Sequence, residues 1–130
     1  MIKSFKSSQY RFLSNAFGAS FQVDGVWYRT VEHYLQAHRT TVPFERAQIR
    51  MAQTPTEAKE LGSTAGSRSD WEAIGLDVLR RGVRAKFEQN PVLRQRLLDT
   101  EDEQLKEDET EQTGLGQVLM ETRDQLRSSK

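Results

Sequence analysis

The chain has 130 residues and a mass of 15.0 kDa, which is the size of one domain. It contains no cysteine, which excludes disulfides, thiolate metal sites and cysteine nucleophiles, and its two histidines are too few for an all-histidine metal site. Nothing resembles a signal peptide or an apolar stretch of the ~20 residues that a membrane span needs. We therefore expect a single domain over residues 1–130, in the cytoplasm, without membrane association and without a metal or other cofactor.

The net charge is zero, but the two signs are unevenly distributed. Residues 1–100 carry 15 Lys and Arg against 10 Asp and Glu, whereas residues 101–130 carry 4 against 9. The acidic residues gather in 101–113, which we interpret as a solvated, mobile acidic loop. The basic residues are densest over 80–96, which suits a phosphate-bearing ligand or a nucleic-acid backbone, although mixed surface arginines are also ordinary.

The first predicted elements are two short strands followed by a helix. Residues 20–23 alternate polar and apolar, and Asp24-Gly25 is typical of a two-residue hairpin turn. Residues 26–28 form the second strand of the predicted hairpin. From Thr30 the spacing becomes helical, with Thr30 as the N-cap. One stripe of this helix holds Val31, Tyr34, Leu35 and His38.

Four further helices and a final amphipathic one follow. Pro43 suits the first turn of a helix to residue 53, with Phe44, Ala47 and Met51 facing inward. Thr54-Pro55-Thr56-Glu57 is a capping box, and Gly62 is a natural stop for that helix.

Asp70 caps a longer helix to about residue 87, in which Gly75 and Gly82 indicate close packing or a ligand. Residues 90–98 and 115–126 give the last two helices. The predicted fold is α+β and mainly helical, with a small N-terminal antiparallel sheet packed against about five helices.

Few residues point to catalysis on their own. Glu32 lies in the first turn of a helix directly after a strand, and Glu32-His33 lacks the second histidine of a zinc protease motif. A carboxylate at a helix N-terminus is often only a partner of the helix dipole. The residues alone therefore leave both interpretations of Glu32 open.

Three motifs near the N-terminus resemble the NADAR (YbiA-like) family: Phe12-Leu13-Ser14-Asn15, Phe21-x-Val23-Asp24-Gly25, and residues 30–37, which read TVEHYLQA. The resemblance continues in order through Thr54-Pro55, Glu57-Ala58-Lys59, Leu61-Gly62, Trp71, Arg84-Ala85-Lys86-Phe87, Asn90-Pro91, Leu97-Leu98 and Leu115-Gly116-x-x-Leu119-Met120-Glu121-x-Arg123. It covers nearly the whole chain and implies the YbiA-like fold.

The resemblance implies hydrolysis of an N-glycosidic bond between (phospho)ribose or ADP-ribose and a nitrogenous base. Glu32 matches the central glutamate of the family and becomes the expected catalytic residue. A fixed carboxylate suits this chemistry, because positive charge develops on the ribose ring as the C–N bond breaks. The expected substrate is a small ribosyl or ADP-ribosyl molecule, with ADP-ribosylated nucleic acid and a protein partner as further possibilities.

The chain also departs from the family pattern. Arg39 stands where the family usually has a lysine, and an arginine cannot form the Schiff base associated with that lysine. Gly62-Ser63 replaces Gly-Arg, and the family's Asp-x-x-Trp-Gly segment, its glycine-rich loop before the last helix and the asparagine before Leu-Gly are absent. These losses support an alternative: a catalytically impaired member that acts as a nucleotide- or ADP-ribose-binding module or as a protein-interaction module.

The expected pocket lies between the start of the Glu32 helix and residues 80–87. Arg39 and Arg84 are expected to hold phosphate. Several residues have two open interpretations. Trp27 and Trp71 are core residues or stacking platforms, and His33 is an exposed helix residue or a pocket acid. Lys86 reaches phosphate or covers a helix surface, and Asn15 lines the pocket or forms a turn. The predicted substrate-binding residues are Asn15, His33, Gln36, Arg39, Trp71, Arg84 and Lys86.

Overall fold

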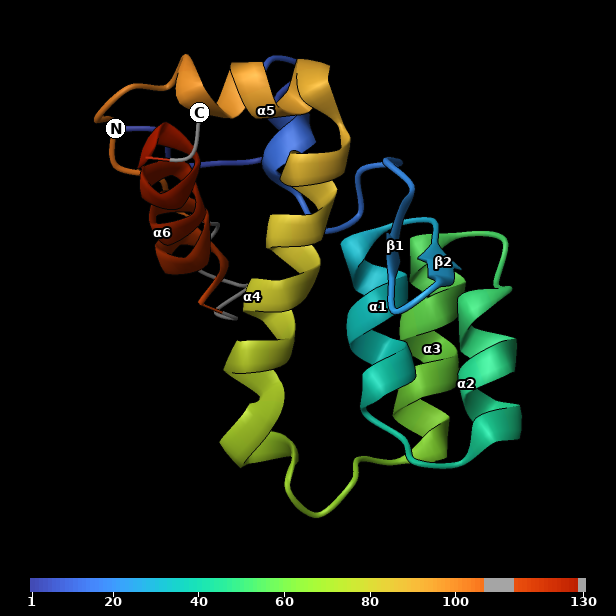
Figure 1. The fold of residues 1–130 in the computed structure, drawn as a ribbon. Helices are drawn as coiled ribbons and strands as arrows, with labels where there is room; N and C mark the ends of the chain where they lie inside the picture. Colours follow the sequence, from blue (N-terminus) through green and yellow to red (C-terminus); the bar gives the residue numbers. More distant parts are fainter. Residues whose placement is uncertain (107–113, 129–130) are drawn as a thin grey trace.

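The computed structural model describes residues 1–106 and 114–128 (Figure 1). Within them a short 3-10 turn, η1 (Arg11–Leu13), precedes a hairpin of β1 (Phe21–Val23) and β2 (Val26–Tyr28). Six helices follow: α1 (Val31–His38), α2 (Pro43–Arg50), α3 (Pro55–Ala65), α4 (Trp71–Gln89), α5 (Pro91–Leu98) and α6 (Leu115–Ser128). This confirms a mainly helical α+β fold with a small antiparallel sheet, with six helices instead of about five. No helix in the described ranges is long and apolar enough to span a bilayer.

The hairpin follows the sequence prediction. Asp24 and Gly25 have φ values of 53° and 81°, the left-handed conformations that a tight two-residue turn between antiparallel strands requires. The register pairs Phe21 with Tyr28 and places both side chains in the core. Trp27 faces the other way and is 58% exposed, so it is neither a core residue nor part of a pocket wall described below.

Local capping explains where α1 and α3 begin. Thr30 Oγ1 accepts the backbone N–H of His33 at 3.1 Å, and Thr54 Oγ1 accepts that of Glu57 at 3.1 Å. Asp70 makes no such bond before α4, because its carboxylate pairs with Arg68 at 2.6 Å. The predicted caps of α1 and α3 are therefore confirmed, and the predicted side-chain cap of α4 is wrong.

Two predictions about α2 and α3 are also wrong. Phe44 and Met51 are 70% and 65% exposed, because α2 lies at the edge of the molecule and buries Ile49 instead. The helix α3 passes through Gly62 and ends at Ala65, and Gly66 follows with a φ of 78°.

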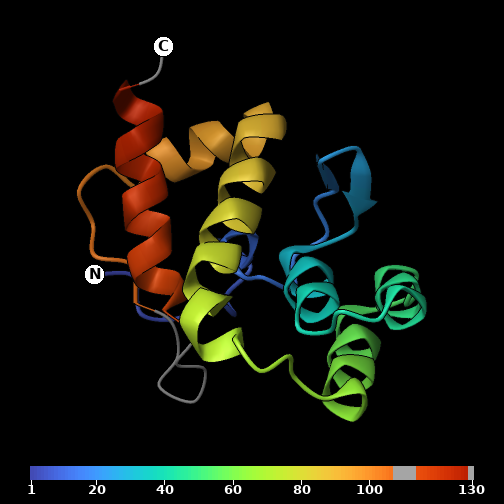
Figure 2. The same cartoon turned by 60° about the horizontal axis from the view of Figure 1, so that its bottom comes forward.

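The helices form two groups that meet along one seam. The hairpin, α1, α2 and α3 form one group, while α4, α5, α6 and the N-terminal segment form the other (Figure 1). In Figure 2 the link from α3 to α4 joins the two groups. At the seam, α4 packs on α1 so closely that a Cβ atom added at Gly82 would lie 2.7 Å from the Tyr34 ring. The prediction of close packing at Gly82 is thus confirmed.

Residues 101–106, the described part of the predicted acidic loop, pair with the N-terminal segment of the chain. Ile2 and Leu105 form a parallel bridge, with hydrogen bonds from Ile2 N to Gln104 O at 2.8 Å and from Lys106 N to Ile2 O at 2.9 Å. Leu105 is buried. Residues 107–113 of the predicted acidic loop lie outside the described residues, so the mobility of the whole segment stays a prediction.

Candidate active site

A pocket of about 370 Å³ lies at the seam between the two helix groups. Its walls come from the start and end of α1, from α3, and from the first half of α4, with Asn15 beside them. Charged groups of both signs line it together with apolar ones. The lining residues are Asn15, Glu32, Leu35, Gln36, Arg39, Lys59, Trp71, Glu72, Gly75, Leu76 and Leu79.

Glu32 occupies the first turn of α1, where the helix dipole stabilises negative charge. Its backbone N–H donates to Asn15 O at 3.0 Å, which ties the start of the helix to the preceding segment. In the side chain, Oε2 accepts a hydrogen bond from Gln36 Nε2 at 3.0 Å. No described residue donates to Oε1, so one carboxylate oxygen is left to act on a ligand.

Arg39 stands at the other end of α1, where its positive charge suits the C-terminal end of the dipole. Its Nε and Nη2 donate to Ser67 Oγ at 3.1 and 2.7 Å, and its guanidinium lies 5.8 Å from the ring centroid of Trp71. Lys59 reaches the same pocket from α3. Neither cation has a carboxylate partner among the described residues, so both can attract an anionic ligand.

The structure brings together five of the eight residues that the sequence suggested: Asn15, Glu32, Gln36, Arg39 and Trp71 line the pocket. His33 does not line it, since its ring is 1% exposed, with Nδ1 2.7 Å from Thr30 Oγ1 and Nε2 3.0 Å from Ala52 O. It therefore fastens α1 to the end of α2. Arg84 lies outside the pocket on the exposed face of α4, bonded to Glu88 and Gln125.

Lys86 lies beneath the site instead of inside it. Its side chain is 1% exposed, and Nζ donates to Phe12 O at 2.7 Å and to Ser14 O at 3.0 Å. Burial lowers the pKa of Lys86 to about 7, because desolvation disfavours the charged form. Lys86 thus anchors the segment that carries Asn15, and it neither reaches the pocket nor covers a helix surface.

The pocket uses a different part of α4 from the one predicted. Residues 71–79 line it, and residues 80–87 do not. The sequence contains a pattern that indicates this face of α4: the four-residue spacing of Trp71, Gly75 and Leu79 places them on one side of the helix. Lys59 and Glu72 were missed as lining residues, although Lys59 belongs to the Glu-Ala-Lys motif that supported the resemblance.

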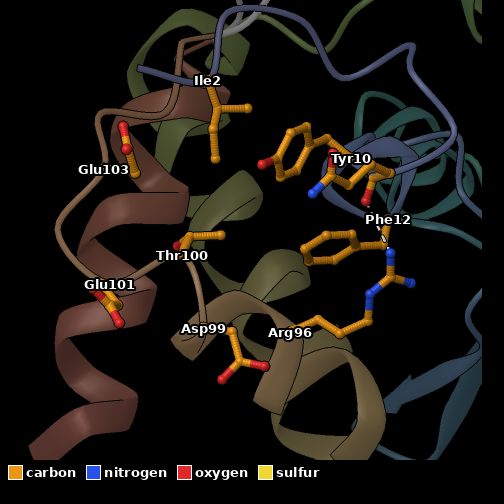
Figure 3. Close-up of a pocket in the computed structure, with 9 residues that line it drawn as sticks. Ile2, Tyr10, Phe12, Arg96, Asp99, Thr100, Glu101 and Glu103 are labelled. Carbon is orange, nitrogen blue, oxygen red and sulfur yellow. Dashed lines mark hydrogen bonds between the residues drawn. The ribbon is translucent and has the colours of Figure 1, made fainter.

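A second pocket, of about 470 Å³, lies between α5, the N-terminal segment and residues 99–103 (Figure 3). Three of its four charged side chains, Arg96, Asp99 and Glu103, already have partners in the chain. The N-terminal ammonium lies 2.6 Å from Glu103, and Arg96 Nη2 donates to Gln9 O at 2.9 Å with its guanidinium over the Phe12 ring. None of the predicted site residues lines it, so the pocket at the seam is the candidate site. In the described residues, no three His, Asp or Glu side chains are grouped as a set of metal ligands.

The fold and the ordered motifs agree with one protein family. The NADAR domain model matches residues 4–127. The chain therefore belongs to the NADAR family.

Named relatives match most of this chain. N-glycosidase YbiA of Escherichia coli strain K12 is 34% identical over 95% of this chain and 86% of the relative. An N-glycosidase of Nostoc punctiforme is 31% identical over 92% of this chain and 87% of the relative. The NMR structure of E. coli YbiA superposes with a TM-score of 0.87 at 33% identity, covering 98% of this chain and 85% of that one.

Proposed function

We propose that this protein is an N-glycosidase that hydrolyses the bond between (phospho)ribose or ADP-ribose and a nitrogenous base, with Glu32 as the catalytic carboxylate. The observation that carries the proposal is the arrangement of Glu32. Its carboxylate is oriented by Gln36, keeps one oxygen without a donor among the described residues, and faces a pocket that also holds Arg39 and Lys59. The N-glycosidases among its relatives support the reaction class.

Glu32 would act at the ribose carbon. As the C–N bond breaks, its electron pair leaves with the base, and positive charge develops on the ribose ring. The nearby carboxylate stabilises this charge, and it then accepts a proton from the water that attacks the anomeric carbon. The base takes up a proton, and the products are free ribose, in its phosphorylated or ADP-linked form, and the base.

The remaining pocket residues would bind the two ends of the substrate. Arg39 and Lys59 provide positive charge for a phosphate, and Lys59 takes the role expected of Arg84, which does not line the pocket. Trp71 offers a ring face for the base. Because the guanidinium of Arg39 stays protonated, it cannot form an imine with the sugar, and the proposed route needs none.

Substitution of Glu32 tests the proposal. Glu32→Gln keeps the shape of the side chain and removes its charge, and we expect kcat to fall by about 10²–10³ with KM little changed. Release of base is measured from ribosylamino-pyrimidine phosphates and from ADP-ribosylated guanosine. Glu72→Gln is the matched control, since this carboxylate also lines the pocket but accepts no hydrogen bond from Gln36. Equal losses in the two variants would contradict a specific role for Glu32.

Arg39 favours one alternative function. The arginine replaces the family lysine and is tied to Ser67 and Gln36, an arrangement suited to holding an anion. A protein that binds ADP-ribose or a nucleotide without cleaving it would use the same pocket. Tight binding of the substrates above, with no base released by the wild type, would establish this alternative.

A further inference from the structure

We infer that Gly62 is a positioning residue for Glu32 and that it acts through the side chain of Gln36. The inference rests on the proposed role of Glu32 in catalysis. Gly62 belongs to α3 and Gln36 to α1, so the contact between them joins the two helices that form one wall of the pocket.

The amide of Gln36 is held at both of its ends. Nε2 donates to Glu32 Oε2 at 3.0 Å, and Oε1 accepts from Arg39 Nη1 at 3.4 Å. A reversed amide would place its oxygen against the carboxylate and its N–H groups against the guanidinium, and both contacts are repulsive. Residues Glu32, Gln36 and Arg39 lie on one face of α1 because they are four and three positions apart. The guanidinium therefore fixes the direction in which Gln36 donates.

Gly62 closes the space behind this amide. A Cβ atom added at Gly62 would lie 2.0 Å from Gln36 Oε1, 2.9 Å from Cδ and 3.0 Å from Cβ. The contacts with Oε1 and Cδ are shorter than real Cβ contacts, so any side chain at position 62 displaces the Gln36 amide from its place. Gln36 is 5% exposed and lines the pocket together with Glu32, so a displaced amide disturbs its hydrogen bond to that carboxylate.

The backbone gives no other reason for glycine here. Gly62 lies inside α3, three residues before its end, and has no positive φ. A glycine inside a helix costs about 1 kcal/mol relative to alanine. The close approach of the Gln36 amide accounts for this residue, whereas a turn or a helix cap does not.

A double-mutant cycle tests the inference. We expect Gly62→Ala to lower kcat by about 10–10²-fold with little change in KM, since a misplaced carboxylate loses transition-state contact more than substrate binding. Gln36→Ala should lower kcat similarly. In the double variant Gly62→Ala/Gln36→Ala, the added methyl group has no amide to displace and keeps only the 3.0 Å approach to the Cβ atom of residue 36. The kcat of the double variant should therefore equal that of Gln36→Ala alone. Gly18→Ala is the control, because a Cβ atom there meets nothing within 4 Å.

Stability gives the second readout. Urea unfolding should show Gly62→Ala less stable than the wild type, with much of the loss recovered in the double variant. If Gly62→Ala does not fold, the double variant and Gln36→Ala still give the kinetic comparison with the wild type. Additive losses in both kcat and stability overturn the inference alone. If the wild type is inactive and the stability losses of Gly62→Ala and Gln36→Ala are additive, both the proposed N-glycosidase function and this inference are overturned. If the wild type is inactive but the stability losses are not additive, the catalytic role is overturned and the contact between Gly62 and Gln36 is established.

Discussion

Lys86 shows how a single buried charge supports the site from below. Its ammonium satisfies the carbonyl oxygens of Phe12 and Ser14, and it lies 5.0 Å from the Phe87 ring centroid. Those carbonyls belong to the segment that leads to Asn15, whose own carbonyl accepts the N–H of Glu32. Removing one partner of such a buried contact leaves the other unsatisfied, at a cost of about 1–3 kcal/mol or more.

The lowered pKa of Lys86 predicts how stability depends on pH. The pKa is about 7 in the folded protein, against about 10.4 for a lysine in an unfolded chain. Between these values the unfolded chain binds more protons, so the free energy of unfolding rises with pH by up to about 1.4 kcal/mol per pH unit from this group. Lys86→Met removes the titrating group, so its stability should lack this rise.

Urea unfolding at pH 7 and pH 9 measures the difference. The stability of the wild type relative to that of Lys86→Met should increase from pH 7 to pH 9. Lys106→Met is a control for the loss of a lysine, because Lys106 is exposed. If the wild type and Lys86→Met change in parallel with pH, Lys86 does not titrate as its burial implies.

Residue identity alone could not separate site residues from supporting ones. His33 and Glu32 are neighbours in the sequence, yet the helix turns His33 into the interior toward Ala52 and leaves Glu32 at the pocket. Lys86 looked like a surface or phosphate-binding lysine, because its burial depends on the loop from residues 12–14, which is distant in the sequence. Gln36 and Arg39 line the same pocket as Glu32 because they share its helix face, and their role in binding substrate stays a prediction.

At the scale of elements, the sequence predicted helix starts better than helix faces. Thr30 and Thr54 determine their caps through contacts three residues away, which are visible in the sequence. The inward face of α2 depends on which neighbours cover it, so the apolar spacing of Phe44 and Met51 was misleading. Gly62 resembles a helix stop in the sequence because glycine is common just after helix ends, but in the structure it allows a close approach between α1 and α3.

The packing of α1 against α4 gives a prediction at this scale. Gly82→Ala adds a methyl group 2.7 Å from the buried Tyr34 ring, and we expect a loss of about 1–3 kcal/mol in the free energy of unfolding. Gly75→Ala lies on the same helix, where the new atom would meet Trp71 at 3.4 Å, an ordinary contact. It should leave stability unchanged or raise it by up to about 1 kcal/mol.

Thermal and urea unfolding of the two variants make the comparison. Both substitutions remove the same glycine flexibility from α4, so the difference between them isolates the contact with Tyr34. Equal stability of the two variants would show that the two helices can separate without cost, which the buried seam does not allow.

At the scale of the whole molecule, the site exists only where the two helix groups meet. Glu32, Gln36 and Arg39 come from α1, Lys59 from α3, and Trp71 and Glu72 from α4. The sequence identified the contribution of α1, since it lies in one motif. It could not fix which turns of α4 face α1, because that depends on the close approach at Gly82 and on the path of the α3–α4 link.

Because the pocket joins the two groups, a ligand bound there should stabilise both at once. ADP-ribose at 100 times its dissociation constant should raise the free energy of unfolding by about 2.7 kcal/mol and raise Tm accordingly. Hydrogen exchange should show added protection at the start of α1 and over residues 71–79 of α4. Lys59→Gln should weaken the effect, and adenosine, which lacks a phosphate, should give much less of it.

This measurement also separates the three functions that the family resemblance leaves open. Stabilisation by ADP-ribose together with release of base from a ribosyl substrate supports the N-glycosidase. Stabilisation without turnover supports a binding module in which Arg39 and Lys59 hold the phosphates. If neither ADP-ribose nor ribose 5-phosphate changes Tm or the protection of α1 and α4, the pocket does not take a phosphate-bearing ligand. The N-glycosidase and the phosphate-binding module, which both depend on this pocket, are then excluded, and a protein-interaction role becomes the interpretation to test.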